Sequence, residues 1–110
     1  MVYVLREVKL HLASGGRIYV QTPDAEDNLL MLGWDADDVR ELIYCLDDGC
    51  YHKSEWAKTG NKQWLACDAY AIAYDDSQKV KDSRFPHYYL KFGFANNVAH
   101  CGIISCHLSP

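Results

Sequence analysis

Four short segments in the second half of the chain carry side chains able to cleave a phosphodiester bond without a metal ion. Each places a cationic, imidazole or phenolic group beside an aromatic or small residue: Cys50–Ser54, Cys67–Tyr70, Tyr88–Lys91 and Ser105–His107. Lysine can stabilise the negative charge that grows on phosphoryl oxygens, and histidine is the residue type whose ordinary pKa lies closest to neutrality. These residue types predict attack by a ribose 2′-OH, with side chains moving the protons.

The first half of the chain has the spacing of three helices that would support these segments. The first and third helices each show one apolar stripe: Leu5, Val8 and Leu12, then Val39, Leu42, Ile43 and Leu46. Gly15 follows the first helix, which we expect to end near residue 14. Thr22 before a proline predicts a capped second helix over about Pro23–Leu32, with Gly33 as the left-handed residue after it. Asp35 can cap the third helix.

After residue 49 the apolar period changes to about two, which predicts β-strands. The expected strands are Tyr51–Trp56, Trp64–Tyr74, His87–Ala95 and Val98–His107, with a tight turn at Asn96 and Asn97. Arg17–Val20 is short enough to be a connector or a brief edge strand, and Asp75–Pro86 is expected to be one long loop. We therefore predict a single α+β domain over residues 1–110, with N-terminal helices on one face of an antiparallel sheet of about four strands.

Strand alternation assigns side chains to the two faces of this sheet. The set Tyr88, Leu90, Phe92 and Phe94 is expected to face the core. Tyr89 and Lys91 then lie on the open face. In the last strand, Cys101, Ile103, Ser105 and His107 alternate with Gly102, Ile104 and Cys106. Pairing of the last two strands through the expected turn would bring His107 near His87 and Tyr89. In the first strand, His52 and Ser54 lie on one face, whereas Tyr51, Lys53 and Glu55 lie on the other. Periodicity leaves open which of these two sets faces outward.

The formal net charge of −4 is unevenly distributed. Residues 1–50 hold four Lys or Arg against ten Asp or Glu, whereas residues 51–110 hold seven against five. A basic footprint is usual for nucleic-acid binding, so only the second half suits RNA. No apolar run approaches the roughly 18 residues of a membrane helix, and charged residues interrupt Val4–Leu12, unlike a signal peptide. We expect a soluble, cytoplasmic protein with no membrane partner.

The five cysteines form an odd set without a C-x-x-C pair: Cys45, Cys50, Cys67, Cys101 and Cys106. This set fits neither a disulfide framework nor a zinc knuckle, so we expect reduced thiols, no metal and no cofactor. The alternative, a small zinc-binding regulator, would join Cys101, Cys106 and His107 to Cys45, Cys50 or His52.

The same segments resemble the motility quorum-sensing regulator (MqsR) toxins, ribonucleases of type II toxin–antitoxin pairs with a RelE-like fold. The family's Tyr-Lys-Ser resembles His52-Lys53-Ser54, and its Trp-Gln-Asp-Val-Tyr resembles the segment 66–70. Its Tyr-Leu-Lys matches Tyr89-Leu90-Lys91, and its closing Ser-Phe-Lys is similar to segment 105–107. The early part of the chain, including Leu32-Gly33-Trp34-Asp35, also resembles the family's N-terminal half, so the likeness covers nearly the whole chain.

The resemblance implies roles for individual residues. Lys53, Tyr89 and His107 fall on the family's catalytic lysine, tyrosine and terminal lysine, and we expect His107 to act as general acid or base. The expected substrate-binding residues are His52, Ser54, Cys67, Lys91 and Trp64, with Cys67 at the position of the family's glutamine. Trp64 has a second interpretation, as a core anchor rather than a platform for an unpaired base.

The resemblance therefore implies a metal-independent endoribonuclease toxin that cleaves mRNA by 2′-OH attack and is neutralised by a cognate antitoxin protein. Homodimer formation stays open. The alternative is a non-catalytic interaction domain that keeps the toxin fold to bind an antitoxin-like protein or RNA. Convergence of Lys53, Tyr89, Lys91 and His107 in an open groove would favour the enzyme, whereas burial or scatter would favour the binder.

Overall fold

The computed structural model describes residues 1–94 and 100–109. Over these residues the elements follow one another as α1 (Leu5–Ala13), β1 (Arg17–Val20), α2 (Pro23–Leu32), α3 (Ala36–Cys45), a 3-10 turn (Asp48–Cys50), β2 (Tyr51–Lys58), β3 (Trp64–Asp75), β4 (Val80–Lys81), β5 (His87–Phe94) and β6 (His100–Leu108). The α+β class is confirmed. The expected turn at Asn96 and Asn97 lies outside the described residues.

The sheet is larger than the sequence predicted, because two short segments join it. Its order over the described residues is β1-β6-β5-β3-β2, with β4 paired to β3. β1 runs parallel to β6, with Val20 opposite Ile103, so Arg17–Val20 is an edge strand. Tyr74 pairs with Lys81, which places β4 inside the segment expected to be one loop. The described sheet therefore has six strands and is mixed, rather than having about four antiparallel strands.

The predicted helix ends are confirmed by their caps. The Thr22 hydroxyl accepts a hydrogen bond from the Ala25 N–H at 3.0 Å, and Gly33 has φ 70° in the left-handed region. Asp35 caps α3 by accepting bonds from the N–H groups of residues 37 and 38, and the Asp38 carboxylate accepts from the Asp35 N–H at 2.9 Å. This reciprocal capping box fixes where α3 begins.

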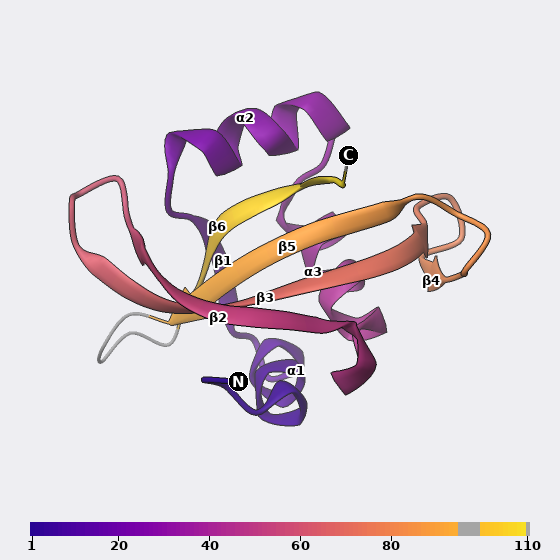
Figure 1. Ribbon diagram of the computed structural model, residues 1–110, viewed down its shortest axis with the longest axis horizontal. Helices are drawn as coiled ribbons and strands as arrows, with labels where there is room; N and C mark the ends of the chain where they lie inside the picture. The colour runs from indigo at the N-terminus through magenta and orange to yellow at the C-terminus, as the bar shows by residue number, and fades with distance from the viewer. Residues whose placement is uncertain (95–99, 110) are drawn as a thin grey trace.

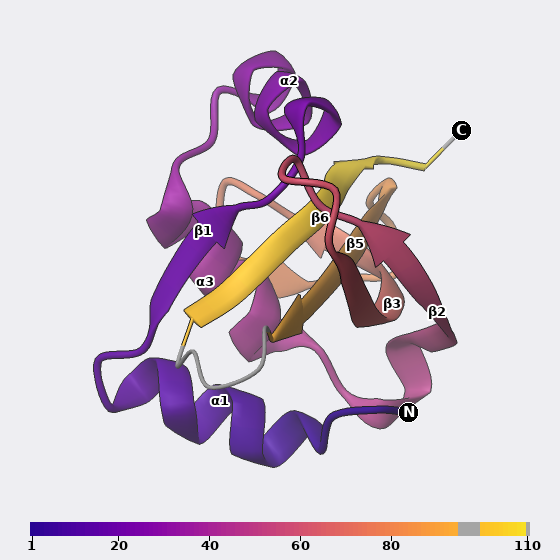
Figure 2. The same ribbon diagram turned by 90° about the vertical axis from the view of Figure 1, so that its left-hand side faces the viewer.

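The helices cover one face of the sheet and leave the other to solvent. Figure 2 shows α3 beside one face, with α1 and α2 at opposite borders of the sheet; Figure 1 looks onto the uncovered face, with β2 in front. Leu90 and Phe92 are fully buried among the helices' apolar stripes. The Phe92 ring stacks on that of Tyr70 with centroids 5.8 Å apart. The predicted core face of β5 is therefore confirmed.

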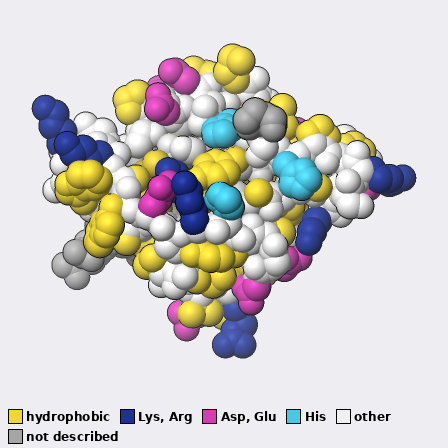
Figure 3. Space-filling model, viewed as in Figure 1, with side chains coloured by type: hydrophobic (Ala, Val, Ile, Leu, Met, Phe, Trp, Pro, Cys, Tyr) yellow, Lys and Arg dark blue, Asp and Glu magenta, His cyan; other side chains and the backbone are white. Residues whose placement is uncertain are grey.

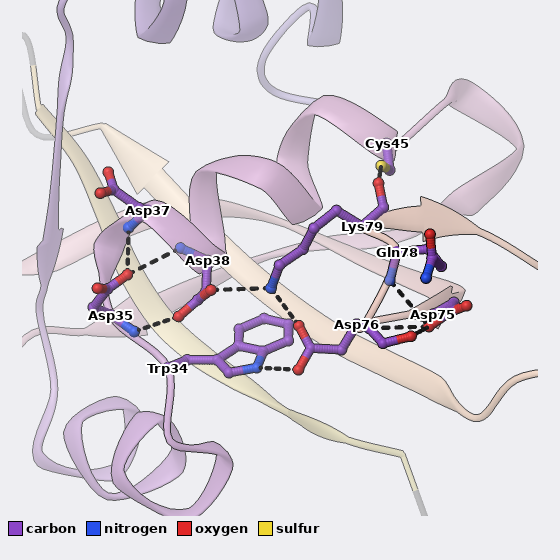
Figure 4. A network of polar contacts seen from close by, with 10 residues as sticks. Trp34, Asp35, Asp37, Asp38, Cys45, Asp75, Asp76, Gln78 and Lys79 are labelled. Atoms are coloured by element: carbon purple, nitrogen blue, oxygen red, sulfur yellow. Dashed lines mark hydrogen bonds and ion pairs between the residues drawn. The ribbon is translucent and has the colours of Figure 1, made fainter.

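A polar network joins α3 to the segment between β3 and β4 (Figure 4). The Lys79 ammonium bonds to Asp38 at 3.0 Å and to Asp76 at 2.5 Å. The Trp34 indole N–H donates to Asp76 at 3.1 Å, and the Lys79 ammonium lies 5.5 Å from the Trp34 ring centre. These contacts order a segment that sequence composition alone described only as polar.

Two β-bulges change which residues share a face. The β2–β3 register shifts between Tyr51 and Lys53. In β6, Ser105 lies opposite Lys91 but Ile103 lies opposite Phe92, so Ile104 is the extra residue. The strict alternation expected for the last strand is therefore wrong: the bulge puts Ser105 on the open face although Ile103 faces the core.

The hairpin between β2 and β3 closes one end of the open face. Its Gly60 N–H donates to the Gln21 carbonyl at 2.7 Å. Beneath the hairpin, Leu65, Cys67 and Ile104 form a second small apolar cluster. Gly93 is required there because a Cβ would collide with the carbonyl oxygen of residue 66. The remaining part of the open face carries the polar side chains of β2, β5 and β6.

Candidate active site

Three rings form a row across the open face. Tyr89 on β5 lies directly opposite His107 on β6, and their ring centroids are 5.3 Å apart at 25°. His52 on β2 approaches the other side of the Tyr89 ring at 6.3 Å and 76°. Between them, β3 presents only the small side chain of Ala71, which pairs with Tyr89. Figure 3 shows histidine side chains near lysine and acidic side chains on this face.

The bulge in β2 explains how His52 reaches the row. Tyr51 faces the core and contacts Tyr70, with ring centroids 5.8 Å apart. Lys53 is the next residue of β2 in register with β3, opposite Ala69. The intervening His52 is therefore extra, and its ring turns toward Tyr89. Periodicity could not assign the outward face of this strand because the bulge breaks the period there.

Two lysines lie beside the row and share one carboxylate. The Lys91 Nζ is 2.5 Å from Glu55 Oε1, and the Lys53 Nζ is 3.4 Å from Glu55 Oε2. The Lys91 side chain is only 16% exposed, whereas that of Lys53 is 50% exposed. The hydrogen bond from Lys91 is the largest cause of the lowered pKa of Glu55, so this carboxylate stays ionised at neutral pH.

Two expected substrate-binding residues are not accessible from this face. The Ser54 hydroxyl points to the opposite side of β2, where it donates to Asp68 Oδ1 at 2.6 Å. Cys67 shares the open-face side of β3, but it is fully buried under the hairpin. Burial raises the pKa of the Cys67 thiol to about 11, so it is a neutral group without access to a substrate. Those two positions are therefore corrections to the predicted site.

Trp64 lies apart from the row, on the hairpin, and its interpretation as a core anchor is wrong. It is 62% exposed, and Trp56 on the same hairpin is 68% exposed. The two indoles line one open hollow, and the Lys58 ammonium lies 5.4 Å from the centre of the Trp64 ring. This pair is a surface feature suited to stacking against a flat ligand.

Sequence reasoning missed two carboxylates. Glu55 shares the face of Lys53 by simple alternation, which was a usable signal. Asp68 is completely buried; it accepts hydrogen bonds from the N–H groups of Val2 and Tyr3, both at 2.8 Å, and from Ser54. Because two of these partners are backbone N–H groups more than 60 residues away, no residue pattern in the sequence predicts this role.

The residues proposed for a zinc site are separated by the sheet. Cys101 and Cys106 belong to the main core, whereas His107 lies on the open face beside Tyr89. Within residues 1–94 and 100–109, no three His, Cys, Asp or Glu side chains are placed to hold a metal ion. The five cysteines, all of them described, are free thiols.

The geometry combines two imidazoles, a phenol and two ammonium groups on one exposed face. Imidazoles on both sides of the Tyr89 ring can accept and donate a proton across a group bound above it. The ammonium groups can stabilise an anion. Such a face suits a phosphodiester better than a neutral apolar ligand.

Comparison of the chain with known protein families, curated proteins and solved structures gives no match. The likeness to the MqsR family consequently rests on the sequence motifs alone. No helix among the described residues combines the length and apolar character needed to cross a membrane.

Proposed function

We propose that this chain is a metal-independent endoribonuclease with a RelE-like fold, acting as the toxin of a type II toxin–antitoxin pair. The observation that carries the proposal is the row of His52, Tyr89 and His107 on the uncovered face, with Lys53 and Lys91 beside it. All five residues come from motifs that resemble the family, and they lie on three different strands.

In the proposed reaction, one imidazole accepts the proton of a ribose 2′-OH as its oxygen attacks the adjacent phosphorus. The bond to the 5′-oxygen breaks, and the second imidazole, initially protonated, donates a proton to that leaving oxygen. Lys53 and Lys91 stabilise the charge on the phosphoryl oxygens, and the Tyr89 hydroxyl donates a hydrogen bond to one of them. The products are a 2′,3′-cyclic phosphate and a 5′-hydroxyl.

The exposed tryptophans support single-stranded RNA as the substrate. Unpaired bases stack on aromatic side chains, which is how most proteins recognise single-stranded RNA. Trp56 and Trp64 offer two such rings. Residues 56–67 contain Lys58 and Lys62 but no carboxylate, in a chain whose formal net charge is −4. The hairpin is therefore a locally basic, aromatic surface, as mRNA binding requires.

The acidic helices suit a different partner. Residues 1–50 carry most of the carboxylates, and α2 also exposes Leu30 and Met31. A cognate antitoxin with a basic, partly apolar surface would dock on this side and leave the strand face to RNA. A cytoplasmic location belongs to this proposal, because mRNA would be the substrate, and homodimer formation stays open.

A second candidate, a non-catalytic interaction domain with the toxin fold, is favoured by two observations. Glu55 already neutralises part of the lysine charge. The position of the family's glutamine is occupied by Cys67, which is buried. Such a domain would bind an antitoxin-like protein or RNA without cleaving it.

Single-turnover cleavage of a 5′-labelled, mixed-sequence RNA in EDTA distinguishes the endoribonuclease from the non-catalytic interaction domain. We expect cleavage to continue in EDTA, to yield 2′,3′-cyclic phosphate ends, and to fail on the same sequence made with 2′-deoxyribose. Lys53→Ala should lower both RNA binding and cleavage, whereas Lys81→Gln, on β4, should change neither. Absence of cleavage on every RNA offered, with and without ribosomes, would reject the enzyme in favour of the interaction domain.

A further inference from the structure

The carboxylate of Glu55 occupies the place between the two lysines that a phosphate group needs. Its two oxygens each face one ammonium, at 2.5 Å from Lys91 and 3.4 Å from Lys53. A phosphodiester also presents two anionic oxygens, and both groups accept charge-assisted hydrogen bonds from ammonium groups. Glu55 therefore makes the contacts that a bound phosphodiester would make.

Burial makes this arrangement selective for an anion. The Lys91 side chain is 16% exposed and lies opposite Ala69 on β3 and Ser105 on β6. Because water reaches Lys91 poorly, its ammonium requires a nearby anion more than a solvated surface lysine does. The Glu55 side chain is 33% exposed and sits on edge strand β2, so it can rotate toward solvent when another anion arrives.

We propose that Lys53 and Lys91 form an oxyanion site for one phosphate group, in which Glu55 is a built-in competitor that the ligand displaces. The identification of that phosphate as part of RNA rests on the proposed function, but the site itself does not. The opposite role for Glu55, holding the lysines in position for the ligand, makes the reverse prediction for its removal.

The test is the affinity for inorganic phosphate and for a 2′-deoxy oligonucleotide, measured by NMR titration of the full chain. Glu55→Gln keeps the shape of the side chain and removes its charge. It should tighten binding of both probes by about two- to fivefold, the size expected for a partly exposed ion pair. The amide signals of Lys53 and Lys91 should move most.

The matched control is Asp47→Asn. Asp47 directly precedes the 3-10 turn and pairs with Lys81 on β4 at 2.8 Å, away from Lys53 and Lys91. Its replacement by Asn removes one negative charge, as Glu55→Gln does. If Asp47→Asn tightened binding as much as Glu55→Gln, the effect would come from the overall charge of the protein, and the proposed oxyanion site would be rejected. Unchanged or weaker binding by Glu55→Gln would also reject the proposed site. Glu55→Ala and thermal unfolding of both variants show whether local misfolding causes such a result.

These measurements use probes that the protein cannot cleave, so they are independent of catalysis. Tighter binding by Glu55→Gln together with a wild type that cleaves no RNA would support the oxyanion site and reject the ribonuclease. Cleavage by the wild type with no gain in Glu55→Gln would support the ribonuclease and reject Glu55 as a competitor.

Discussion

His107 is the residue whose placement bears most on mechanism, because the resemblance puts a lysine at its position. Its ring stacks on Tyr89, and its Nδ1 lies 2.9 Å from the Leu108 carbonyl oxygen. If the carbonyl accepts a hydrogen bond from Nδ1–H, then Nε2 is left as the nitrogen that exchanges a proton with the substrate. In the proposed reaction, this backbone contact orients the ring for acid–base chemistry.

His107→Ala should consequently lower the single-turnover cleavage rate by about 10²- to 10⁴-fold, the usual contribution of a positioned general acid or base. Affinity for a 2′-deoxy oligonucleotide should change much less. His100→Ala is the control, because His100 lies at the other end of β6 against Tyr19. Full activity in His107→Ala would remove this imidazole from the mechanism.

Residue patterns predicted about half of the candidate site. Tyr89 and Lys91 followed from alternation in β5, and His107 followed from the expected pairing of the last two strands, because β5 and β6 stay in register from residue 88 to residue 91. Alternation could not assign His52 to a face, because a bulge depends on how two strands pair and gives no recognisable pattern in the sequence of one strand. Ser54 and Cys67 shared motifs with site residues, yet one faces the opposite side and the other lies beneath the hairpin.

At the scale of elements, local signals fixed the helices and tertiary contacts decided the sheet. The α2 and α3 boundaries follow from caps formed within four residues of the chain. β1 forms only because β6 offers it a partner 83 residues later, Val20 with Ile103. β4 likewise depends on Tyr74 and its neighbour in β3. Short edge strands have too few residues to show a period of their own.

Asp38 links two elements, so its loss should destabilise the fold. Asp38→Ala removes one arm of the capping box and the contact with Lys79, which should cost about 1–2 kcal/mol of unfolding free energy. Asp37→Ala is the control: its side chain is 83% exposed and pairs with Arg40 on the same helix, so the cost should stay below about 0.5 kcal/mol. Urea unfolding at pH 7 measures both.

The stability of wild type and Asp38→Ala should also depend differently on pH. The hydrogen bond from the Asp35 N–H, followed by the contact with Lys79, holds the pKa of Asp38 below its ordinary value. A lowered folded-state pKa stabilises the protein fully above the unfolded value of about 4, and this stabilisation is lost as the pH falls through the folded value. The difference between wild type and Asp38→Ala should therefore shrink at pH 3. A difference that stays constant from pH 7 to pH 3 would contradict the role of the ionised carboxylate.

Across the whole molecule, charge is unevenly distributed between the helical half and the strand half. The helical half is acidic, and the strand half carries the exposed lysines of the hairpin and the open face. In the proposed function, RNA binds this second surface of a chain whose net charge is −4. Stacking on Trp56 and Trp64 should therefore supply much of the affinity, with a small number of phosphate contacts adding the rest.

This division predicts a shallow salt dependence for binding of a 2′-deoxy oligonucleotide. If Lys53, Lys58 and Lys62 each neutralise one phosphate, the logarithm of the association constant should fall with the logarithm of salt with a slope of about −2. Lys58→Gln should make the slope less negative by about 0.7, whereas Lys81→Gln, in β4, should leave it unchanged. Quenching of tryptophan fluorescence reports the binding directly, because Trp56 and Trp64 are exposed and Trp34 is buried. A slope of zero, or one that Lys81→Gln changes as much as Lys58→Gln, would show that the hairpin does not hold the nucleic acid.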